Sequence, residues 1–196
     1  YSKYMYHLDL LDEILVATVL LQLDLKYLLE DNCPPEVEPV LNHGDYRMGN
    51  LLVEGSALTG VLDWEIAHFG DPHEDLAFGC MAVWRFARYD RPALGLGSIA
   101  DYIAAYEAEA GVAIDPARFR FWTIYRTVWW ALGCLKMAAQ WRSGADRMLE
   151  RVVISRRTSE QELDLLLLLA LLAEAWVSED PATTPPPRGG HRPEAP

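Results

Sequence analysis

The sequence predicts a mainly α-helical fold with one small β-hairpin, and two patterns lead to this prediction. Apolar side chains recur at a spacing typical of helices with one buried face over residues 75–89, 99–110, 116–143 and 146–176. The stretch LLVEGSALTGVLDW, residues 51–64, instead has two β-rich runs on either side of Gly55 and Ser56. This arrangement predicts two short strands joined by a turn over residues 54–58.

A further helix is expected before the hairpin. Apolar residues recur at helical spacing from Leu10 to Leu29, with a break expected near Asp24, and the prolines of residues 32–39 then end the helix. Residues 178–196 contain Pro-Pro-Pro, Gly-Gly and almost no large apolar side chains, which predicts a disordered tail. The 196 residues, 51% of them hydrophobic, suffice for one core, so we expect one folded unit over residues 1–177.

The charge and the cysteines limit the classes of partner and compartment. The net charge of −12 and the pI near 4.8 argue against a nucleic-acid partner, because phosphate binding needs a basic surface. A cationic or metal-chelated ligand suits this charge better. The cysteines are too widely spaced for a zinc site and too few for a disulfide framework, which favours a reducing, cytoplasmic setting. They are Cys33, Cys80 and Cys134.

The most apolar run, Leu165 to Ala173, predicts a core helix and not a membrane partner. It is short for a membrane span, and Asp164 and Glu174 flank it directly. No signal peptide is visible in residues 1–196. The first residue is Tyr1 and not Met, so we expect further sequence upstream.

Polar side chains are concentrated in LNHGDYRMGNLLV, residues 41–53. His43, Asp45, Arg47 and Asn50 fall within eight residues, and an apolar run follows at once. Such a pattern predicts a loop whose polar side chains are held by a neighbouring strand. Loops on rigid scaffolds are where binding and catalytic residues concentrate, so this loop is the candidate site.

Three polar segments follow one another within residues 43–77. They are HGDYRMGNLL, then GVLDWE, then GDPHEDLA. Together they resemble the aminoglycoside phosphotransferase family, whose C-terminal lobe is similar to that of protein kinases. His43, Asp45 and Asn50 stand at the spacing of the kinase catalytic loop, H-x-D-x-x-x-x-N. Asp63 follows across the predicted hairpin, as the metal-binding Asp of kinases does. The resemblance implies the C-terminal lobe of a protein-kinase-like (α+β) fold.

The resemblance also implies an activity, which is transfer of the γ-phosphoryl group of ATP to a hydroxyl of a small molecule. Asp45 would accept the hydroxyl proton, and Asn50 and Asp63 would hold Mg²⁺ between the nucleotide phosphates. His43, Asn50 and Asp63 would then form the cofactor-binding set. Arg47 stands where protein kinases commonly keep a lysine that faces the transferred phosphate, and it retains the positive charge.

Two further residue patterns refine this expectation. Asp75 would brace the catalytic loop by accepting backbone or His43 hydrogen bonds, although a helix N-cap explains it equally well. Trp64 and Glu65 replace the Phe-Gly of the protein-kinase DFG motif, which favours the small-molecule kinase branch.

Two clusters have both a functional and a structural interpretation. The aromatic stretch FRFWTIYRTVWW, residues 119–130, could form a wall for a cationic substrate, but core packing between helices explains it more simply. Acidic side chains could likewise form a substrate cleft, or merely a solvated helix face. They are Asp101, Glu107, Glu109 and Asp115.

Alternatives from other functional classes stay open. No segment before Asp45 predicts the sheet, phosphate-covering loop and Lys–Glu pair of a nucleotide-binding N-terminal lobe. The sequence could therefore form an incomplete lobe that serves as a binding or dimerisation module, with a homodimer covering its apolar surface. A metal-dependent phosphoesterase using His68, His73, Asp63 and Asp71 is a third and weaker hypothesis.

Overall fold

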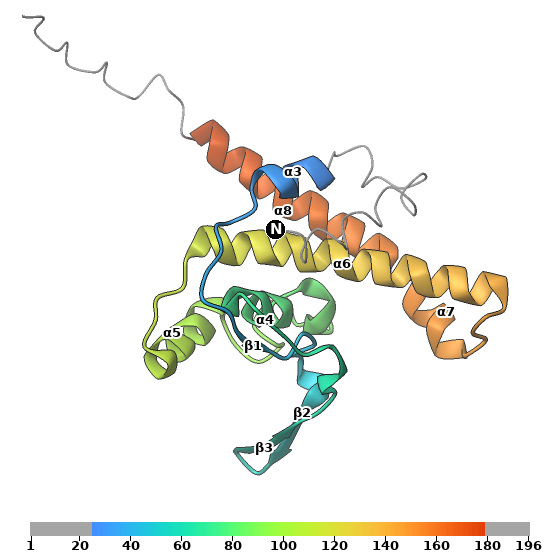
Figure 1. The fold of residues 1–196 in the computed structure, drawn as a ribbon, viewed down its shortest axis with the longest axis horizontal. Helices are drawn as coiled ribbons and strands as arrows, with labels where there is room; N and C mark the ends of the chain where they lie inside the picture. The colour runs from blue at the N-terminus through green and yellow to red at the C-terminus, as the bar shows by residue number, and fades with distance from the viewer. Residues whose placement is uncertain (1–24, 179–196) are drawn as a thin grey trace, which may run out of the picture.

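The computed structural model describes residues 25–178 and is mainly helical (Figure 1). The α-helices are α3 (Leu25–Asp31), α4 (Pro72–Gly79), α5 (Ile99–Ala110), α6 (Pro116–Ser143), α7 (Leu149–Ser155) and α8 (Thr158–Ser178). Short 3₁₀ helices are η1 (Met48–Asn50), η2 (Trp64–Ile66) and η3 (Ala82–Arg85). The part of the predicted first helix before Leu25, and the predicted tail beyond Ser178, lie outside the described residues.

Two antiparallel strand pairs accompany the helices. The predicted hairpin is confirmed, with β2 (Leu51–Glu54) paired to β3 (Ala57–Val61). A second pair joins β1 (Val40–Asn42) to β4 (His68–Gly70) and was not predicted. Strands of three residues are too short to show alternation in the sequence, which is why this pair escaped prediction. β1 and β4 flank the candidate loop and the hairpin, so they close the segment that carries the site.

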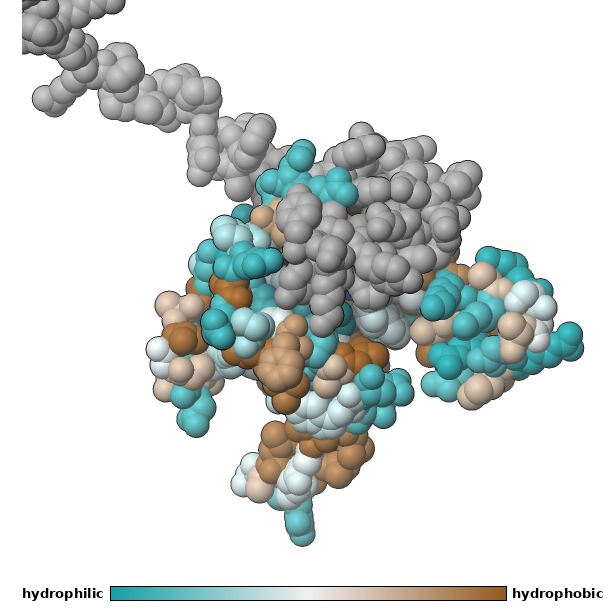
Figure 2. Space-filling view, viewed as in Figure 1, coloured by the Kyte–Doolittle hydropathy of each residue, from teal (hydrophilic) through white to brown (hydrophobic). Residues whose placement is uncertain are grey.

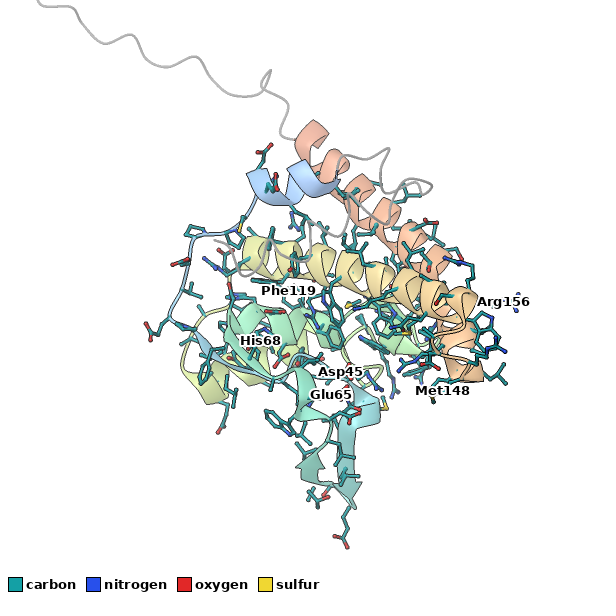
Figure 3. The ribbon with its side chains drawn as sticks, turned by 45° about the vertical axis from the view of Figure 1, so that its right-hand side comes forward. Asp45, Glu65, His68, Phe119, Met148 and Arg156 are labelled. Carbon is teal, nitrogen blue, oxygen red and sulfur yellow. The ribbon has the colours of Figure 1, made fainter. Side chains whose placement is uncertain are left out.

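Helix α6 is the centre of the molecule. Figures 1 and 3 show it crossing the fold, with α3 and α8 on one side and α4 and the strands on the other. The hairpin β2–β3 projects away from the helices. The main core lies around α6 and consists of Leu25, Leu29, Ala77, Trp122, Ile124, Tyr125, Val128, Ala131, Leu132 and Leu165. Leu165 is fully buried, whereas Leu166 and Leu167 of the same apolar run are 41% and 56% exposed, so the core-helix prediction holds for only one face of this run.

Helices α5 and α6 begin and end where the sequence predicts, because local capping signals fix them. The Ser98 side chain accepts a hydrogen bond from the backbone of Asp101 at the start of α5, and Asp115 caps α6 in the same way. Gly111 and Gly144 end the two helices with positive φ angles of 68° and 77°.

The acidic residues of the α5 region have structural partners. Asp101 accepts a hydrogen bond from the Ser98 hydroxyl at 2.6 Å, and Glu107 accepts one from the backbone of Ile114 at 2.8 Å. Asp115 caps α6. These contacts support the structural interpretation of the acidic cluster over a substrate cleft.

The predicted helix over residues 75–89 is wrong at both ends. Asp71 caps α4 and Pro72 occupies its first turn, so the helix begins before residue 75. It ends at Gly79, whose carbonyl oxygen accepts the backbone N–H of Leu94 at 2.9 Å, and a Cβ at this position would lie only 2.7 Å from Leu94 Cδ2. The approach of a later loop, which the sequence does not reveal, therefore sets the end of α4.

The predicted helix over residues 146–176 is in fact two helices. Asp146 accepts a hydrogen bond from the backbone of Met148 at 2.9 Å, which delays the start of α7. The Thr158 hydroxyl donates to the carbonyl oxygen of Ser155 at 3.1 Å, where α7 ends and α8 begins. Ser and Thr side chains that bond nearby backbone groups compete with helix continuation in this way.

The hairpin exposes apolar side chains. Figure 2 shows apolar atoms gathered on it, and Leu52, Val53 and Leu58 are all about half exposed or more. Patches of this kind mark contact surfaces more often than isolated apolar side chains do.

Within residues 25–178, no helix has the length and hydropathy needed to cross a membrane. The cysteines are free thiols, with Cys80 and Cys134 buried.

A titration on α8 gives a testable prediction. Burial raises the pKa of the Asp164 carboxyl to about 6, with Arg85 opposing the rise and Glu160 adding to it. The folded state then holds this proton more tightly than the unfolded chain, so the ionised carboxylate lowers stability above about pH 6. We expect Asp164→Asn to raise the melting temperature at about pH 8, and the gain to shrink as the pH falls from about 6 to 4. Thermal unfolding followed by circular dichroism tests this prediction, with Asp31→Asn at an exposed position as the control. Equal increases in melting temperature at about pH 8 and about pH 4 would contradict it.

Candidate active site

The candidate loop lies between β1 and η1, and η2 packs against it. In Figure 3, Asp45 and Glu65 are both drawn where the hairpin joins the helices. The ring of Trp64, from η2, lies 4.6 Å from that of His43 between centroids. The hairpin thus returns the chain to the loop that precedes it, and the three motifs of the sequence meet in space.

The Asp45 carboxylate is held by two donors from its own loop. Arg47 Nε lies 3.1 and 3.2 Å from the two carboxylate oxygens, and Asn50 Nδ2 donates to Oδ2 at 2.7 Å. Asn50 Nδ2 also donates to the backbone carbonyl of Asp45 at 2.9 Å. The Asp45 side chain remains 21% exposed. A carboxylate that is fixed in orientation yet open to solvent is suited to accept a proton from a bound hydroxyl.

His43 is a structural member of the loop. Its Nδ1 accepts the backbone N–H of Asp45 at 3.1 Å, so Nε2 carries the proton and donates to the carbonyl of Leu62 at 2.7 Å. Both ring nitrogens are therefore used within the protein. This leaves neither for the cofactor contact that the family resemblance implied. The ring instead links the catalytic loop to the residue before Asp63.

Asp63 follows directly from that link. The backbone N–H of Leu62 donates to the carbonyl oxygen of Asn50 at 2.8 Å, so Leu62 is bonded to the loop on both sides. Asp63 is exposed and has φ 63° and ψ 55°, a left-handed conformation that Asp tolerates better than most residues. Strained backbone of this kind is concentrated at functional sites.

Two residues near the loop have side-chain oxygens of the kind that Mg²⁺ prefers, and this ion also retains several waters or phosphate oxygens. Asn50 donates through Nδ2, and no donor among residues 25–178 is recorded for its Oδ1. No described side chain pairs with the Asp63 carboxylate either. The two positions thus offer an amide and a carboxylate oxygen, which fit Mg²⁺. No group of three or more His, Cys, Asp or Glu residues in the described chain could hold a metal by itself.

Asp75 braces the loop, as predicted. Its two carboxylate oxygens accept the backbone N–H groups of His43 at 2.5 Å and Gly44 at 2.8 Å. Burial raises the pKa of Asp75, while these two backbone hydrogen bonds oppose the rise. The competing N-cap interpretation is wrong, because Asp71 caps the helix. Gly44 is required here, since its φ is 84° and a Cβ would lie 2.7 Å from the carbonyl oxygen of Ile66.

A buried ion pair that the sequence analysis did not identify holds the other side of the loop. Arg126 on α6 and Glu74 on α4 are each only 4% exposed, and Arg126 Nη1 lies 2.9 Å from Glu74 Oε1. Arg126 Nη2 also donates to the carbonyl oxygen of Gly44. Arg126 is the single charged residue within the apolar and aromatic stretch 121–135 of this helix, which was the available signal for such a pair.

His68 extends this ion pair to β4. Its Nε2 lies 3.1 Å from Glu74 Oε2 and its Nδ1 lies 3.0 Å from the carbonyl oxygen of Ile66. Both partners are acceptors, which favours the imidazolium form. The pKa of His68 is accordingly raised, chiefly by the hydrogen bond to Glu74.

The aromatic stretch of α6 serves packing. Trp122 and Tyr125 belong to the main core. Trp129 and Trp130 pack instead against a second cluster that contains Phe78 and Trp84. The guanidinium of Arg126 stacks on this second cluster, 4.5 Å from the ring of Phe78 and 4.1 Å from that of Trp129. The core interpretation of the stretch is therefore the one that the structure supports.

The residues suggested for a phosphoesterase form a structural network. His73 Nδ1 donates to Asp71 at 2.6 Å, and His73 Nε2 accepts the backbone N–H of Asp115 at 3.1 Å. Arg118 Nη1 lies 2.5 Å from the second oxygen of Asp71. Although burial opposes it, hydrogen bonds from His73 and Arg118 hold the pKa of the Asp71 carboxyl far below its usual range. These contacts join α4 to α6 and involve two of the four suggested residues, His73 and Asp71.

The fold and the sequence were compared with known proteins. A crystal structure from Ralstonia eutropha JMP134, provisionally described as an aminoglycoside phosphotransferase, matches 85% of this chain with a TM-score of 0.68 and 20% identity. The match covers 54% of that protein, so this chain spans about half its length. At this identity the match shows a shared fold.

Sequence comparison adds a relative and a family. Acyl-CoA dehydrogenase family member 10 of Mus musculus is 31% identical over 90 residues, which are 40% of this chain and 8% of that protein. This chain thus spans less than a tenth of the mouse protein. The sequence profile of the phosphotransferase enzyme family matches residues 3–122, more than half of the chain. The chain therefore belongs to the phosphotransferase enzyme family.

Proposed function

We propose that this chain provides the catalytic and acceptor-binding lobe of an ATP-dependent phosphotransferase that acts on a hydroxyl of a small molecule. The observation that carries the proposal is the Asp45 carboxylate, which Arg47 and Asn50 hold on a loop fixed by Asp75. Phosphoryl transfer depends mainly on positioning and on charge neutralisation. A rigid carboxylate beside a cation supplies both.

In this mechanism each side chain has one task. Asp45 orients the acceptor hydroxyl and accepts its proton as the oxygen attacks the γ-phosphorus in line, while the bond from this phosphorus to the β–γ bridging oxygen breaks and ADP leaves. Arg47, through its guanidinium, neutralises charge on the transferred group. His43 keeps the loop in register with Leu62. Arg126 and Asp75 hold the backbone of Gly44 from its two sides.

Asn50 and Asp63 would hold Mg²⁺, through the amide oxygen and the carboxylate. When bound, the metal ion neutralises the nucleotide phosphates and orients the γ-phosphoryl group. Trp64 and Glu65, which follow Asp63, favour a small-molecule acceptor over a protein.

We assign residues 1–177 to the C-terminal lobe of a kinase-like fold. In such a fold the adenine would bind to the separate N-terminal lobe. The acceptor class is a small alcohol, for which aminoglycosides are one example named by the Ralstonia structure. The exposed hairpin, with Leu52, Val53 and Leu58, supports a second candidate function. In that alternative the lobe is a binding or dimerisation module without turnover.

Mg·ATP-dependent transfer of phosphate to a panel of small alcohols tests the proposal, using the full natural protein that contains this sequence. We expect Asp63→Ala to raise the Mg²⁺ concentration for half-maximal turnover by at least about tenfold, because a metal ligand is lost. Asp31→Ala, an exposed aspartate on α3, is the matched control. An unchanged Mg²⁺ requirement would remove Asp63 from the metal site. Absence of transfer to every alcohol, with a dimer in solution, would favour the binding module.

A further inference from the structure

The Arg47 guanidinium is confined on three sides. Its Nε faces the two Asp45 oxygens at 3.1 and 3.2 Å. Its Cζ lies 5.0 Å from the centre of the Trp84 ring, within the range of a cation–π contact. On a further side lies Gly49, where a Cβ would come within 2.3 Å of Arg47 Nη1 and 3.5 Å of Cζ. A side chain at position 49 would therefore push the Nη1 end of Arg47 out of this position.

These contacts leave one part of the guanidinium available. Within residues 25–178, neither Nη1 nor Nη2 of Arg47 donates a hydrogen bond to an acceptor. The Arg47 side chain is 26% exposed. The two Nη groups of a guanidinium can bind two oxygens of one phosphoryl group together. Because Nε alone holds Asp45, the arginine can contact a phosphoryl group and the carboxylate at the same time.

Trp84 is itself held rigidly. It belongs to η3, beyond α4, and is only 5% exposed. Its ring lies 5.4 Å from that of Phe78 and 5.1 Å from that of Trp130, between centroids. This is the same aromatic cluster on which Arg126 stacks. The same aromatic cluster therefore contacts both Arg47, which belongs to the loop, and Arg126, which binds the loop backbone.

We propose that Trp84 is a positioning residue, which together with Gly49 fixes the Arg47 guanidinium so that its two Nη groups face the transferred phosphoryl group. The proposal rests on the proposed phosphotransferase function and deepens it. Trp84 contacts neither substrate nor metal in this account, and acts through Arg47 alone. An arginine fixed before binding loses less entropy when it contacts the phosphoryl group, so the contact contributes more to the rate.

A double-mutant cycle tests whether Trp84 acts through Arg47. We expect Trp84→Leu to lower kcat about tenfold, with the KM for the acceptor nearly unchanged, because a cation–π contact of this kind is lost. Trp84→Phe, which keeps an aromatic face, should retain most of the rate. In an Arg47→Met background, Trp84→Leu should have no further effect on kcat. Additive losses in the double variant would overturn the proposal.

Gly49 provides a second test that does not disturb the core. Gly49 is exposed, so Gly49→Ala should displace the Arg47 side chain and leave the fold intact. We expect it to reproduce the kcat loss of Trp84→Leu. Gly133→Ala, where an added Cβ meets nothing within 4 Å, is the matched control and should keep the parental rate. Parental kcat in Gly49→Ala would contradict the confinement of Arg47.

A measurement without turnover separates this inference from the proposed function. Protons over an aromatic face shift upfield, so the Arg47 side-chain NMR signals should be displaced in the parent chain. They should move toward random-coil positions in Trp84→Leu and in Gly49→Ala, with Arg47→Lys giving the assignment. Displaced signals without turnover on any alcohol would refute the phosphotransferase proposal, but they would support the placement of Arg47 by Trp84 and Gly49. Random-coil signals in the parent chain would refute this placement of Arg47, whatever the turnover.

Discussion

Replacement of Asp45 by asparagine is expected to lower kcat by about a thousandfold and to change the affinity for Mg·ATP by less than about threefold. The amide keeps the size of the carboxylate but has no basicity, so it cannot take the hydroxyl proton. It also offers one acceptor oxygen to two donors, Arg47 Nε and Asn50 Nδ2. Steady-state kinetics, with nucleotide affinity from calorimetry, measures the two effects separately.

The control for Asp45→Asn is Asp31→Asn, which makes the same chemical change at an exposed position on α3. Circular dichroism should show that both variants keep the parental fold. A kcat within about threefold of the parent would refute Asp45 as the base, since proton transfer by a positioned side chain contributes about a hundredfold or more. A loss confined to nucleotide affinity would instead place Asp45 in the metal site.

The largest effect on stability is expected for Arg126→Met, which should lower the free energy of unfolding by about 3–5 kcal/mol. Methionine fills a similar volume, but the buried Glu74 carboxylate then loses its arginine and keeps only His68 as a cationic partner. The carbonyl oxygen of Gly44 also loses its donor. Urea denaturation of the chain measures the change from the shift in midpoint at constant slope.

Two further variants show whether the loss comes from the unpaired charge. Arg126→Met combined with Glu74→Gln should recover part of the stability, because the buried charge is removed together with its partner. Arg142→Met on the same helix replaces an exposed arginine and should change stability by less than about 0.5 kcal/mol. A loss below about 1 kcal/mol in Arg126→Met would show that His68, which already lies 3.1 Å from Glu74, is a sufficient partner for this carboxylate.

Local signals allowed much of the fold to be predicted. The hairpin follows from a turn between two β-rich runs, and α5 and α6 follow from caps and glycines within a few residues of their ends. The candidate loop was identified by its motif, and Asp75 takes the bracing role expected of it. The chemical roles of Asp45, Asn50 and Asp63 stay predictions until the variants are measured.

The hairpin and helices α5 and α6 could be predicted from the sequence because each depends on contacts between residues close in the chain, and the loop that carries the site could be identified from its motif. Only the tertiary structure decided where α4 ends, since Leu94 must approach Gly79 from a distant loop. It alone also brought Arg126 to Glu74, which lies 52 residues earlier, and placed Trp84 on Arg47. A buried ion pair and a ring stacked on a guanidinium are selected by burial and geometry, which no periodicity in the sequence records.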